Sequence, residues 1–456
     1  MAKNRKTGVI RGKLRLSPMQ IIPLTFACII VLGTILLMLP FASRTGVSNG
    51  LMPALIAATS ATCVTGLIPG DTYSMWSGFG QIVLLCMIEI GGLGFMSAAS
   101  LVIFLLRRKV GLRQRMVMAQ ALSVGEMDGV VRLQKWVLAG SLLIQGTGAV
   151  VLFLRFLPQY GWFTAAKWGV FHAVSAFCNA GFDIFGAIAP DQSVAAFAQD
   201  PVVLITLMAL VVLGGLGFFV WEEVVKLRSF KKFSVYTKLV LIVTGVLILG
   251  GAAGIALLEW NNPGTLGTMP LGGKILNAFF QSVTLRTAGF ASFDQALLTD
   301  AGKGFSILVM LVGGSSGSTA GGLKTVTVLV LVLFVIARSR GRSRVSVFKH
   351  NVPAEKVMDA MTIVSIVAGL CMVGAIVICL TAPVSFIDAL FESASALATV
   401  GLTAGVTSQL NLVGQLLIVI FMFFGRVGVL TISLGFLVGD RAQERYRYAD
   451  TNLLIG

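Results

Sequence analysis

Charged side chains are scarce in this sequence: Asp, Glu, Lys and Arg make up 12% of its 456 residues. Hydrophobic residues make up 56%, and the mean hydropathy is +0.91. An ordinary soluble domain carries about 25% charged residues. The scarcity therefore excludes an ordinary soluble protein and predicts a chain that crosses a membrane several times.

Reactive and metal-binding side chains are also few. The six cysteines have no paired spacing suited to a metal or a disulfide framework, so we interpret them as packing residues. No cluster of titratable residues has catalytic spacing, which argues against a membrane enzyme. No glycine-rich phosphate loop follows a strand, and the chain itself is therefore not expected to bind a nucleotide.

Eight apolar runs are long enough to cross a bilayer. They lie near residues 19–39, 81–106, 136–157, 202–225, 239–258, 305–336, 358–380 and 412–438. The first run is too long for a cleavable secretion signal and lacks a small-residue cleavage site, so we expect it to stay as the first helix. Four shorter apolar stretches, at 51–62, 168–177, 275–283 and 386–397, predict re-entrant half-helices.

The net charge of +16 is unevenly distributed. Lys and Arg gather in the amino-terminal tail and in the connections after the second, fourth and sixth apolar runs. These segments fall on one side, and the positive-inside rule places that side, with both termini, in the cytoplasm. The pattern indicates a lipid bilayer rather than nucleic acid as the partner, and it leaves docking of a cytoplasmic protein open. Acidic residues are in excess on the other side, where they would concentrate cations.

A near-identical phrase comes after each half-helix. It ends in a small residue, a glycine and an apolar residue, and its glycine recurs every 108 to 115 residues, at Gly66, Gly181, Gly289 and Gly401. A single tripeptide of this kind means little, because glycine is common in membrane helices. Four in register indicate a fourfold internal repeat, in which each unit has a span, a half-helix, the phrase and a second span.

The repeat predicts how a cation is bound. A half-helix that descends from the outside directs the negative end of its dipole toward the bilayer centre, where four such ends stabilise a dehydrated cation. Glycine lets the chain turn back with its carbonyl oxygens facing a common axis. The carbonyls expected to bind the ion are those of Val64, Thr65, Asn179, Ala180, Thr287, Ala288, Thr399 and Val400. The whole predicted filter comprises Thr62, Cys63, Val64, Thr65, Gly66, Cys178, Asn179, Ala180, Gly181, Arg286, Thr287, Ala288, Gly289, Ala398, Thr399, Val400 and Gly401.

The predicted fold class is an all-α membrane protein with four span–pore-helix–filter–span repeats in a pseudo-fourfold arrangement around one pore. It has eight transmembrane helices and four re-entrant half-helices. The expected boundaries are a basic cytoplasmic tail at 1–18, pore repeats at 19–106, 136–225, 239–337 and 357–438, cytoplasmic connections at 107–135, 226–238 and 338–356, and a cytoplasmic tail at 439–456. The second helix of the third repeat is expected to be broken.

That break is predicted by ten consecutive residues that are all Gly, Ser, Thr or Ala, from Gly313 to Gly322. Lipid cannot satisfy free backbone groups, so the stretch either packs closely against neighbouring helices or unwinds where it lines a watery cavity. Lys324 lies just beyond it, and Arg426 lies within the eighth apolar run. Both cations should face the interior, where they hydrogen-bond the stretch or obstruct a cation.

Three further polar residues stand out. Glu89 lies in the middle of a span, either as a neutral, hydrogen-bonded acid or in a salt bridge with one of the two interior cations. Arg286 is expected to brace the filter through carbonyls or through Glu392. His172 is interpreted as a packed neutral imidazole.

The phrases resemble the Trk/Ktr/HKT superfamily of potassium transporters, most closely the Ktr-type membrane subunit, over nearly the whole chain. Besides the four phrases, the motifs that carry the resemblance are Asn179-Ala180-Gly181-Phe182, Arg286-Thr287-Ala288-Gly289-Phe290, Thr399-Val400-Gly401-Leu402-Thr403 and the stretch from Gly313 to Lys324. Members with glycine in all four filters are generally potassium-selective, whereas serine in the first favours sodium. By this resemblance, Gly66 implies potassium.

The resemblance also implies a gate, an intramembrane loop under the filter. The expected gate comprises Gly313, Gly314, Ser315, Ser316, Gly317, Ser318, Thr319, Ala320, Gly321 and Gly322, together with Lys324 and Arg426. It implies a homodimer on a cytoplasmic ring of nucleotide-binding regulatory subunits, so that a nucleotide acts only through that partner.

The expected function is potassium uptake across the membrane of a bacterial cell, with sodium dependence left open. The alternative is a proton- or sodium-coupled alternating-access carrier of another solute. The parallel orientation of the repeats and the near absence of buried carboxylates argue against that carrier.

Overall fold

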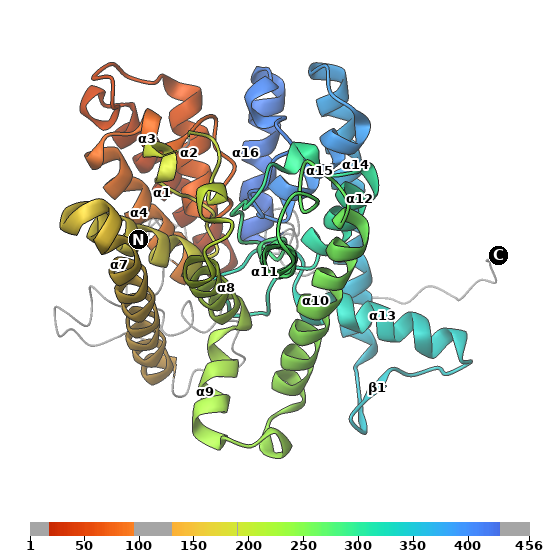
Figure 1. Ribbon diagram of the computed structural model, residues 1–456. Helices are drawn as coiled ribbons and strands as arrows, with labels where there is room; N and C mark the ends of the chain where they lie inside the picture. The colour runs from red at the N-terminus through yellow and green to blue at the C-terminus, as the bar shows by residue number, and fades with distance from the viewer. Residues whose placement is uncertain (1–17, 95–129, 189, 429–456) are drawn as a thin grey trace, which may run out of the picture.

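The computed structural model describes residues 18–94, 130–188 and 190–428, and these residues are mostly helical (Figure 1). The predicted amino-terminal tail up to residue 17, most of the first cytoplasmic connection and the predicted carboxyl-terminal tail lie outside the described residues. Two short strands, β1 (Ser346–Val347) and β2 (His350–Asn351), form an antiparallel hairpin. Apart from that hairpin, the all-α prediction is confirmed for the described part of the chain.

Four long apolar helices frame the molecule. They are α1 (Pro18–Met38), α7 (Val130–Phe177), α10 (Val235–Glu259) and α14 (Ala354–Thr381). Within 18–94, 130–188 and 190–428, these four are long and apolar enough to cross a membrane, and a fifth is added if the bent pair α8 and α9 is one span. They contain the predicted first span of every repeat.

Each long helix leads to a half-helix that packs against it. Three are separate elements, α2 (Leu51–Cys63), α11 (Leu271–Thr284) and α15 (Phe386–Leu397). The fourth is the end of α7, which merges the predicted span 136–157 and half-helix 168–177 across a kink at Gly161, where φ is 73°. All four half-helices thus lie where the short apolar stretches predict helices.

The second helices differ from the prediction. Hydropathy predicts one continuous span at 202–225, but this run forms two helices, α8 (Pro201–Leu216) and α9 (Phe218–Leu227), bent by 95°. Between them Gly217 has φ 93° and ψ 147°, which is not helical. The sixth run is α12 (Asp300–Met310) and α13 (Thr325–Ser339), separated by the small-residue stretch as predicted.

Helices α4 and α16 end within the second and eighth apolar runs. Helix α4 (Gly78–Leu93) ends at Gly94, with φ 82° and ψ 143°, and α16 (Leu412–Val427) ends at Gly428, with φ 92° and ψ 126°. The prediction of continuous helices through 81–106 and 412–438 is therefore wrong at these two glycines, and the rest of each run lies outside the described residues. The signal that sequence analysis missed is the recurring Gly-Gly-Leu-Gly at 91–94 and 214–217, with Gly-Arg-Val-Gly at 425–428.

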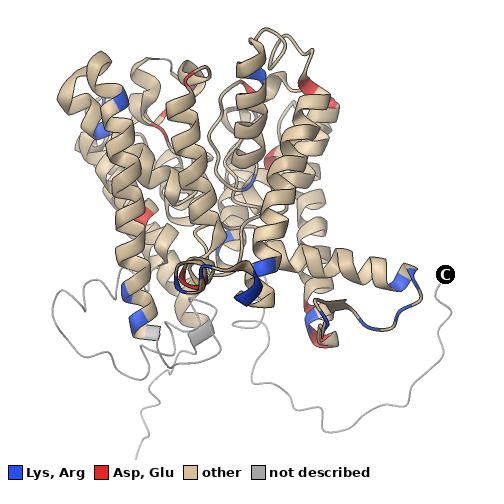
Figure 2. Ribbon diagram, turned by 60° about the horizontal axis from the view of Figure 1, so that its bottom comes forward, with Lys and Arg blue, Asp and Glu red and all other residues tan. Residues whose placement is uncertain are grey.

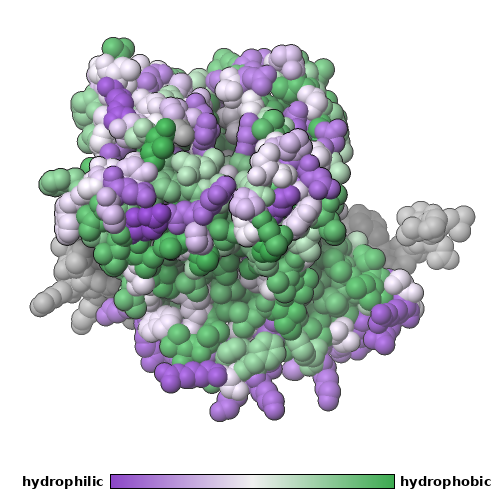
Figure 3. All heavy atoms as spheres, in the orientation of Figure 1, coloured by the Kyte–Doolittle hydropathy of each residue, from purple (hydrophilic) through white to green (hydrophobic). Residues whose placement is uncertain are grey.

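The remaining elements are short. They are η1 (Pro40–Ala42), α3 (Thr72–Met75), η2 (Phe185–Ala187), η3 (Ala195–Phe197), η4 (Phe230–Lys232), η5 (Gln295–Leu297) and η6 (Thr407–Gln409). Figure 2 shows that many of the Lys and Arg residues lie at the end of the molecule that carries α9, α13 and the hairpin. Figure 3 shows an apolar band between two hydrophilic ends, as expected for a protein that spans a bilayer.

Candidate functional site

The four glycine phrases fold into the same left-handed turn. The residue two before the glycine has φ between 53° and 61°, and the glycine has φ between 69° and 100°. These pairs are Val64 and Gly66, Asn179 and Gly181, Thr287 and Gly289, and Thr399 and Gly401. A side chain in place of the glycine would strain the turn, because L-residues rarely adopt positive φ. The repeat in the sequence is therefore also a repeat in backbone conformation.

The four turns close into a ring, which we call the glycine ring. A Cβ atom built on Gly66 would lie 2.8 Å from the carbonyl oxygen of Ala180, and a Cβ atom on Gly181 would lie 2.8 Å from the carbonyl oxygen of Ala288. A Cβ atom on Gly289 would lie 2.6 Å from the carbonyl oxygen of Val400, and a Cβ atom on Gly401 would lie 2.1 Å from the carbonyl oxygen of Thr65. Each glycine thus faces the carbonyl that precedes the next glycine, in cyclic order. The ring brings backbone carbonyls of all four turns together and leaves no room for a side chain at its glycines.

A buried hydroxyl near the end of each half-helix holds the adjoining turn. In two turns it accepts from the glycine N–H: Ser60 from Gly66 at 2.9 Å and Ser395 from Gly401 at 3.1 Å. In the other two it donates to the carbonyl after the glycine: Ser175 to Phe182 and Thr284 to Phe290, both at 2.6 Å. Sequence analysis missed these residues, although a Ser or Thr stands five or six positions before every one of the four glycines.

Several buried polar atoms beside the ring have no hydrogen-bond partner within the described residues. They are the hydroxyls of Thr62, Thr65, Thr287 and Thr399 and the amide nitrogen of Asn179. Buried polar groups are normally satisfied by protein or by ordered water. The four hydroxyls, with the ring carbonyls, offer oxygen ligands without a carboxylate, which is the chemistry of a weakly held monovalent cation.

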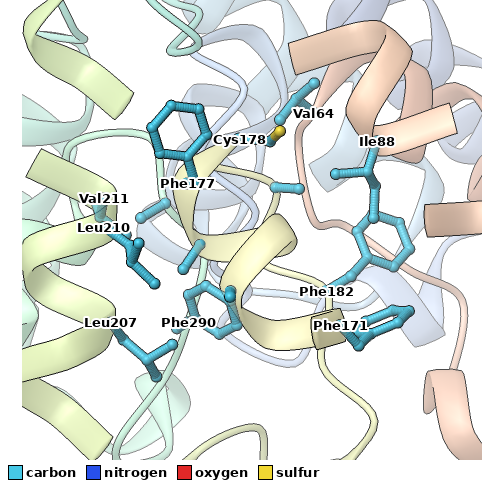
Figure 4. Close-up of a cluster of buried hydrophobic side chains, with 14 of the residues drawn as sticks. Val64, Ile88, Phe171, Phe177, Cys178, Phe182, Leu207, Leu210, Val211 and Phe290 are labelled. Carbon is cyan, nitrogen blue, oxygen red and sulfur yellow. The ribbon is translucent and has the colours of Figure 1, made fainter. Parts of the chain in front are cut away.

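The position before each left-handed residue is buried in all four turns. It is filled by Cys63, Cys178, Arg286 and Ala398. The apolar residues after the glycines anchor the ring in the core. In Figure 4, Phe182 lies near Ile88, and Phe290 lies near Leu207 and Leu210.

The second helices approach the half-helices through glycines. A Cβ atom on Gly91 of α4 would lie 2.0 Å from the carbonyl oxygen of Thr62, one on Gly214 of α8 2.0 Å from that of Phe177, and one on Gly425 of α16 2.1 Å from that of Leu397. Each of these carbonyls belongs to the last turn of a half-helix. Glycine at these three places therefore allows the backbones to touch directly beside the ring.

The stretch 313–322, which we call the small-residue loop, is not helical. Its backbone is bonded to the broken end of α8 and to itself: Ser315 donates to Gly215 at 3.0 Å, Thr319 to Gly214 at 3.2 Å, Phe218 to Gly317 at 2.9 Å, Gly313 to Leu323 at 2.9 Å and Thr325 to Gly314 at 3.0 Å. The stretch is thus unwound, and it also packs closely against its neighbours, so it combines features of both alternatives. Several of its peptide groups are bonded to protein, as lipid could not satisfy them.

The loop lies directly against two turns of the ring. The Thr319 hydroxyl is bonded to the carbonyl of Phe177 at 3.0 Å and to the side-chain oxygen of Asn179 at 3.1 Å. On the other side, a Cβ atom on Gly321 would lie 2.0 Å from the Thr399 hydroxyl, and one on Gly322 2.9 Å from the carbonyl oxygen of Ala398. A movement of the loop therefore changes contacts of the second and fourth turns.

Further side-chain bonds hold the backbone of the loop in place. They include Ser318 to the carbonyl of Ser315 at 2.6 Å, the Tyr236 hydroxyl to the carbonyl of Ser316 at 3.0 Å, Lys324 to the carbonyl of Ala320 at 2.8 Å, and Arg426 to the carbonyl of Thr319. Arg426 also donates to the carbonyls of Gly91 and Gly92 in α4, the latter at 3.0 Å. The two cations predicted to face the interior thus both bind backbone carbonyls of the loop, and Arg426 ties it to two second helices.

Glu89 takes no part in an ion pair with either cation among the described residues. Its carboxylate accepts from Gln145 at 3.0 and 3.3 Å and from the thiol of Cys178 at 3.3 Å. Of the two alternatives for Glu89, the hydrogen-bonded acid is the one present. The bond to Cys178 joins α4 to the second turn of the ring.

Arg286 does not pair with Glu392 among the described residues. The Arg286 side chain is 6% exposed, and its Nε has no partner there. Glu392 instead accepts from Thr403 at 2.7 Å and from Thr407. The predicted brace through Glu392 is therefore wrong.

His172 is buried in a closed set of contacts. Its Nδ1 lies 2.7 Å from the carbonyl oxygen of Trp168, its Nε2 accepts from the N–H of Ile184 at 3.2 Å, and its ring stacks on Phe185 at 3.8 Å. An imidazole that donates from one nitrogen and accepts at the other is neutral. This agrees with the packed residue that the sequence predicts.

In the described chain, the only set of equivalent chemical groups that lie together is the ring of backbone oxygens inside an apolar band. This arrangement defines a class of protein: a helical, multi-pass membrane transport protein. The chain belongs to the TrkH family of cation transport proteins, whose family model matches residues 16–444. This confirms the predicted Trk/Ktr resemblance and the prediction that the protein is not an enzyme.

The chain is similar to named relatives over their full length. It is 38% identical to the potassium/sodium uptake protein NtpJ of Enterococcus hirae, over 98% of this chain and 99% of that one. It is 37% identical to the Ktr system potassium uptake protein B of Bacillus subtilis, over 99% of both chains. The crystal structure of the potassium transporter TrkH from Vibrio parahaemolyticus shares its fold, with a TM-score of 0.71 at 17% identity over 94% of this chain and 86% of that one.

Proposed function

We propose that this protein takes up potassium across the cell membrane through the glycine ring. The observation that carries the proposal is the cyclic contact of each ring glycine with the carbonyl before the next glycine. Such a ring replaces the water around a dehydrated cation with peptide oxygens. The Bacillus subtilis relative is named a potassium uptake protein and the Enterococcus hirae relative a potassium/sodium uptake protein, which supports potassium as the transported ion.

The ion ligands in this proposal are backbone carbonyls of the two residues before each ring glycine. They are Val64, Thr65, Asn179, Ala180, Thr287, Ala288, Thr399 and Val400. The carboxyl-terminal ends of the four half-helices lead into these turns, so their dipoles add negative potential where the ion loses its water. A ring without carboxylates suits rapid passage, because a multi-site path conducts only if no site binds too tightly.

The architecture in this proposal consists of four repeats, each with two membrane crossings and one half-helix, so that the chain crosses a bacterial cell membrane eight times. The four long helices supply the first crossing of each repeat. The interrupted second helices supply the other, with their breaks at the level of the small-residue loop. The basic connections at 226–238 and 338–356 favour a cytoplasmic location for the end that carries α9 and the hairpin, and for both termini.

The small-residue loop serves as the gate in this proposal. Its contacts with the second and fourth turns, and its bonds to Lys324 and Arg426, support that role. Two positive charges beside the loop oppose a cation that leaves the ring, so displacement of the loop with Arg426 opens the path.

A homodimer resting on a cytoplasmic ring of nucleotide-binding subunits completes the proposal. The word system in the name of the Bacillus subtilis relative supports more than one component. Nucleotides and their regulation would then belong to that partner, and the basic connections would form the contact.

Growth of a bacterial strain that lacks its own potassium uptake systems tests the function. The chain should restore growth at low potassium and carry rubidium. The comparison of growth with and without added sodium then decides sodium dependence. Gly401→Ser is the matched inactive control, because its Cβ atom would meet the carbonyl oxygen of Thr65 at 2.1 Å. Equal growth with this variant, or no growth with the unaltered chain at normal expression, would contradict the proposal.

A further inference from the structure

A large apolar cavity lies away from the glycine ring, between α8, α10 and α11. Its volume is about 830 Å³, within the range of about 300–1,000 Å³ of pockets that hold small organic ligands. Its walls include Ile205, Met208, Val212, Ile248, Leu276 and Phe279. In Figure 1, α11 lies between α8 and α10, and Figure 3 shows this face covered by apolar side chains. The cavity therefore opens toward the lipid.

A polar cavity of about 450 Å³ adjoins it at the end nearer the start of α8. The two cavities share Gln199 and Pro201, and the polar one is also lined by Arg155, Gln159 and Tyr160. Arg155 forms an ion pair with Asp200 at 2.7 Å, and its side chain is still 34% exposed. A guanidinium has five N–H donors, so this ion pair leaves several of them for another oxygen ligand.

We propose that the two cavities together form a binding site for one phospholipid with an anionic headgroup. An acyl chain fills the apolar cavity, and the phosphate accepts hydrogen bonds from Arg155 and its polar neighbours. One cavity is apolar and lies within the membrane band, and the other holds Arg155 beside Asp200, with guanidinium N–H donors left over for a phosphate. The two cavities thus match the two parts of such a lipid. The site does not depend on the ion path.

A lipid suits this recess better than a second copy of the chain. Helices associate in membranes through closely packed small residues, because lipid tails are as apolar as leucine and burying leucine gains nothing. Most apolar residues of the cavity walls are instead large, branched or aromatic, and the small ones are Ala209, Gly272 and Gly273. A flexible acyl chain fills a hollow of this kind, whereas a helix surface leaves it empty.

Bound lipid would stabilise one side of the ring. The apolar cavity extends along α11 to Val283, and the next residue, Thr284, donates its hydroxyl to the carbonyl of Phe290 in the third turn. An acyl chain in the cavity thus packs behind the half-helix that ends at this turn. Delipidated protein should unfold at a lower temperature than protein supplied with the preferred lipid.

Native mass spectrometry of the delipidated full chain, titrated with phosphatidylglycerol or phosphatidylcholine, tests the site. The unaltered chain should bind one phosphatidylglycerol more tightly than phosphatidylcholine. Ala209→Trp fills the apolar cavity from an exposed position of α8. It should weaken the binding of both lipids about tenfold, as expected if two methylene groups of the acyl chain are no longer buried. Arg155→Gln should weaken the binding of both lipids, because both carry the phosphate, and should weaken phosphatidylglycerol more, because only that lipid has a net negative charge; equal weakening would contradict the preference for an anionic headgroup.

Two further variants make the test decisive. Ala368→Trp, at an exposed position of α14 outside the cavity, should leave lipid binding unchanged. Ile205→Trp, at a cavity residue that is 55% exposed, replaces Ala209→Trp if that variant does not fold. Loss of lipid with rubidium uptake intact supports the site and separates it from the ion path. Wild-type lipid binding in both cavity variants overturns the proposal. A change from dimer to monomer with lipid binding retained also overturns it, because that result would assign the cavity to a contact between copies of the chain.

Discussion

Replacing Gly66 with serine should reduce the preference for potassium over sodium. Gly66 has φ 100°, and its Cβ atom would lie 2.8 Å from the carbonyl oxygen of Ala180 and 3.2 Å from the Cα of Gly401. A left-handed side chain costs on the order of 1–3 kcal/mol. The carbonyl of Ala180 must also move, and it is one of the proposed ligands. The strain is common to any such substitution, whereas displacement of this ligand acts on the bound ion. If the displacement lowers the difference in binding free energy between the two ions by about 1.4 kcal/mol, potassium preference falls about tenfold.

The assay is the initial uptake of rubidium and sodium by cells that express the variant, compared at equal protein level. Gly46→Ser is the matched control: Gly46 has φ 74°, but no atom lies within 4 Å of its Cβ position. The control carries the same backbone strain without the contact in the ring, so its ion preference should be that of the unaltered chain. The reasoning is refuted if Gly66→Ser keeps its ion preference, or if both variants lose it equally.

Three further predictions concern the loop and the half-helices. Deleting residues 314–321 removes the part of the loop that lies against the ring, so rubidium uptake should become several times faster, and an unchanged rate would reject the gate. Arg426→Gln removes a charge and the ties to α4, so uptake should also become faster, by a smaller factor; slower uptake would contradict an obstructing role. Ser395→Ala leaves the N–H of Gly401 without its buried acceptor, which costs about 1–3 kcal/mol of stability. This variant should therefore unfold at a lower temperature than Ser408→Ala, a control at an exposed position. Equal unfolding temperatures would show that the Ser395 hydroxyl does not hold the turn.

The half-helices illustrate what local sequence can predict. The apolar stretch at 386–397 coincides with α15 (Phe386–Leu397), and that at 51–62 falls one residue short of α2 (Leu51–Cys63). Gly50 and Ser385 mark where these two half-helices begin, and the glycine phrase follows where they end. The order of the phrases likewise predicted four equivalent turns, because a repeated sequence adopts a repeated backbone.

The interruptions of the second helices show where this reasoning stops. Apolar composition continues through Gly217, so hydropathy indicates one span where the structure has a 95° bend. Whether a glycine stays helical depends on the hydrogen-bond partners available to the backbone around it. Here the N–H of Phe218 donates to the carbonyl of Gly317. That partner lies in another repeat, which no local pattern reveals.

The amino-acid sequence by itself determined that this chain is a multi-pass membrane protein and that a glycine phrase occurs in it four times, because these depend on composition and on spacing along the chain. Only the tertiary structure decided the cyclic order of the turns, the contact of the loop with two of them, and the partners of Glu89 and Arg426. Those contacts join residues from different repeats. Their geometry is set by how closely the helices approach, and the three glycines at 91, 214 and 425 permit that approach.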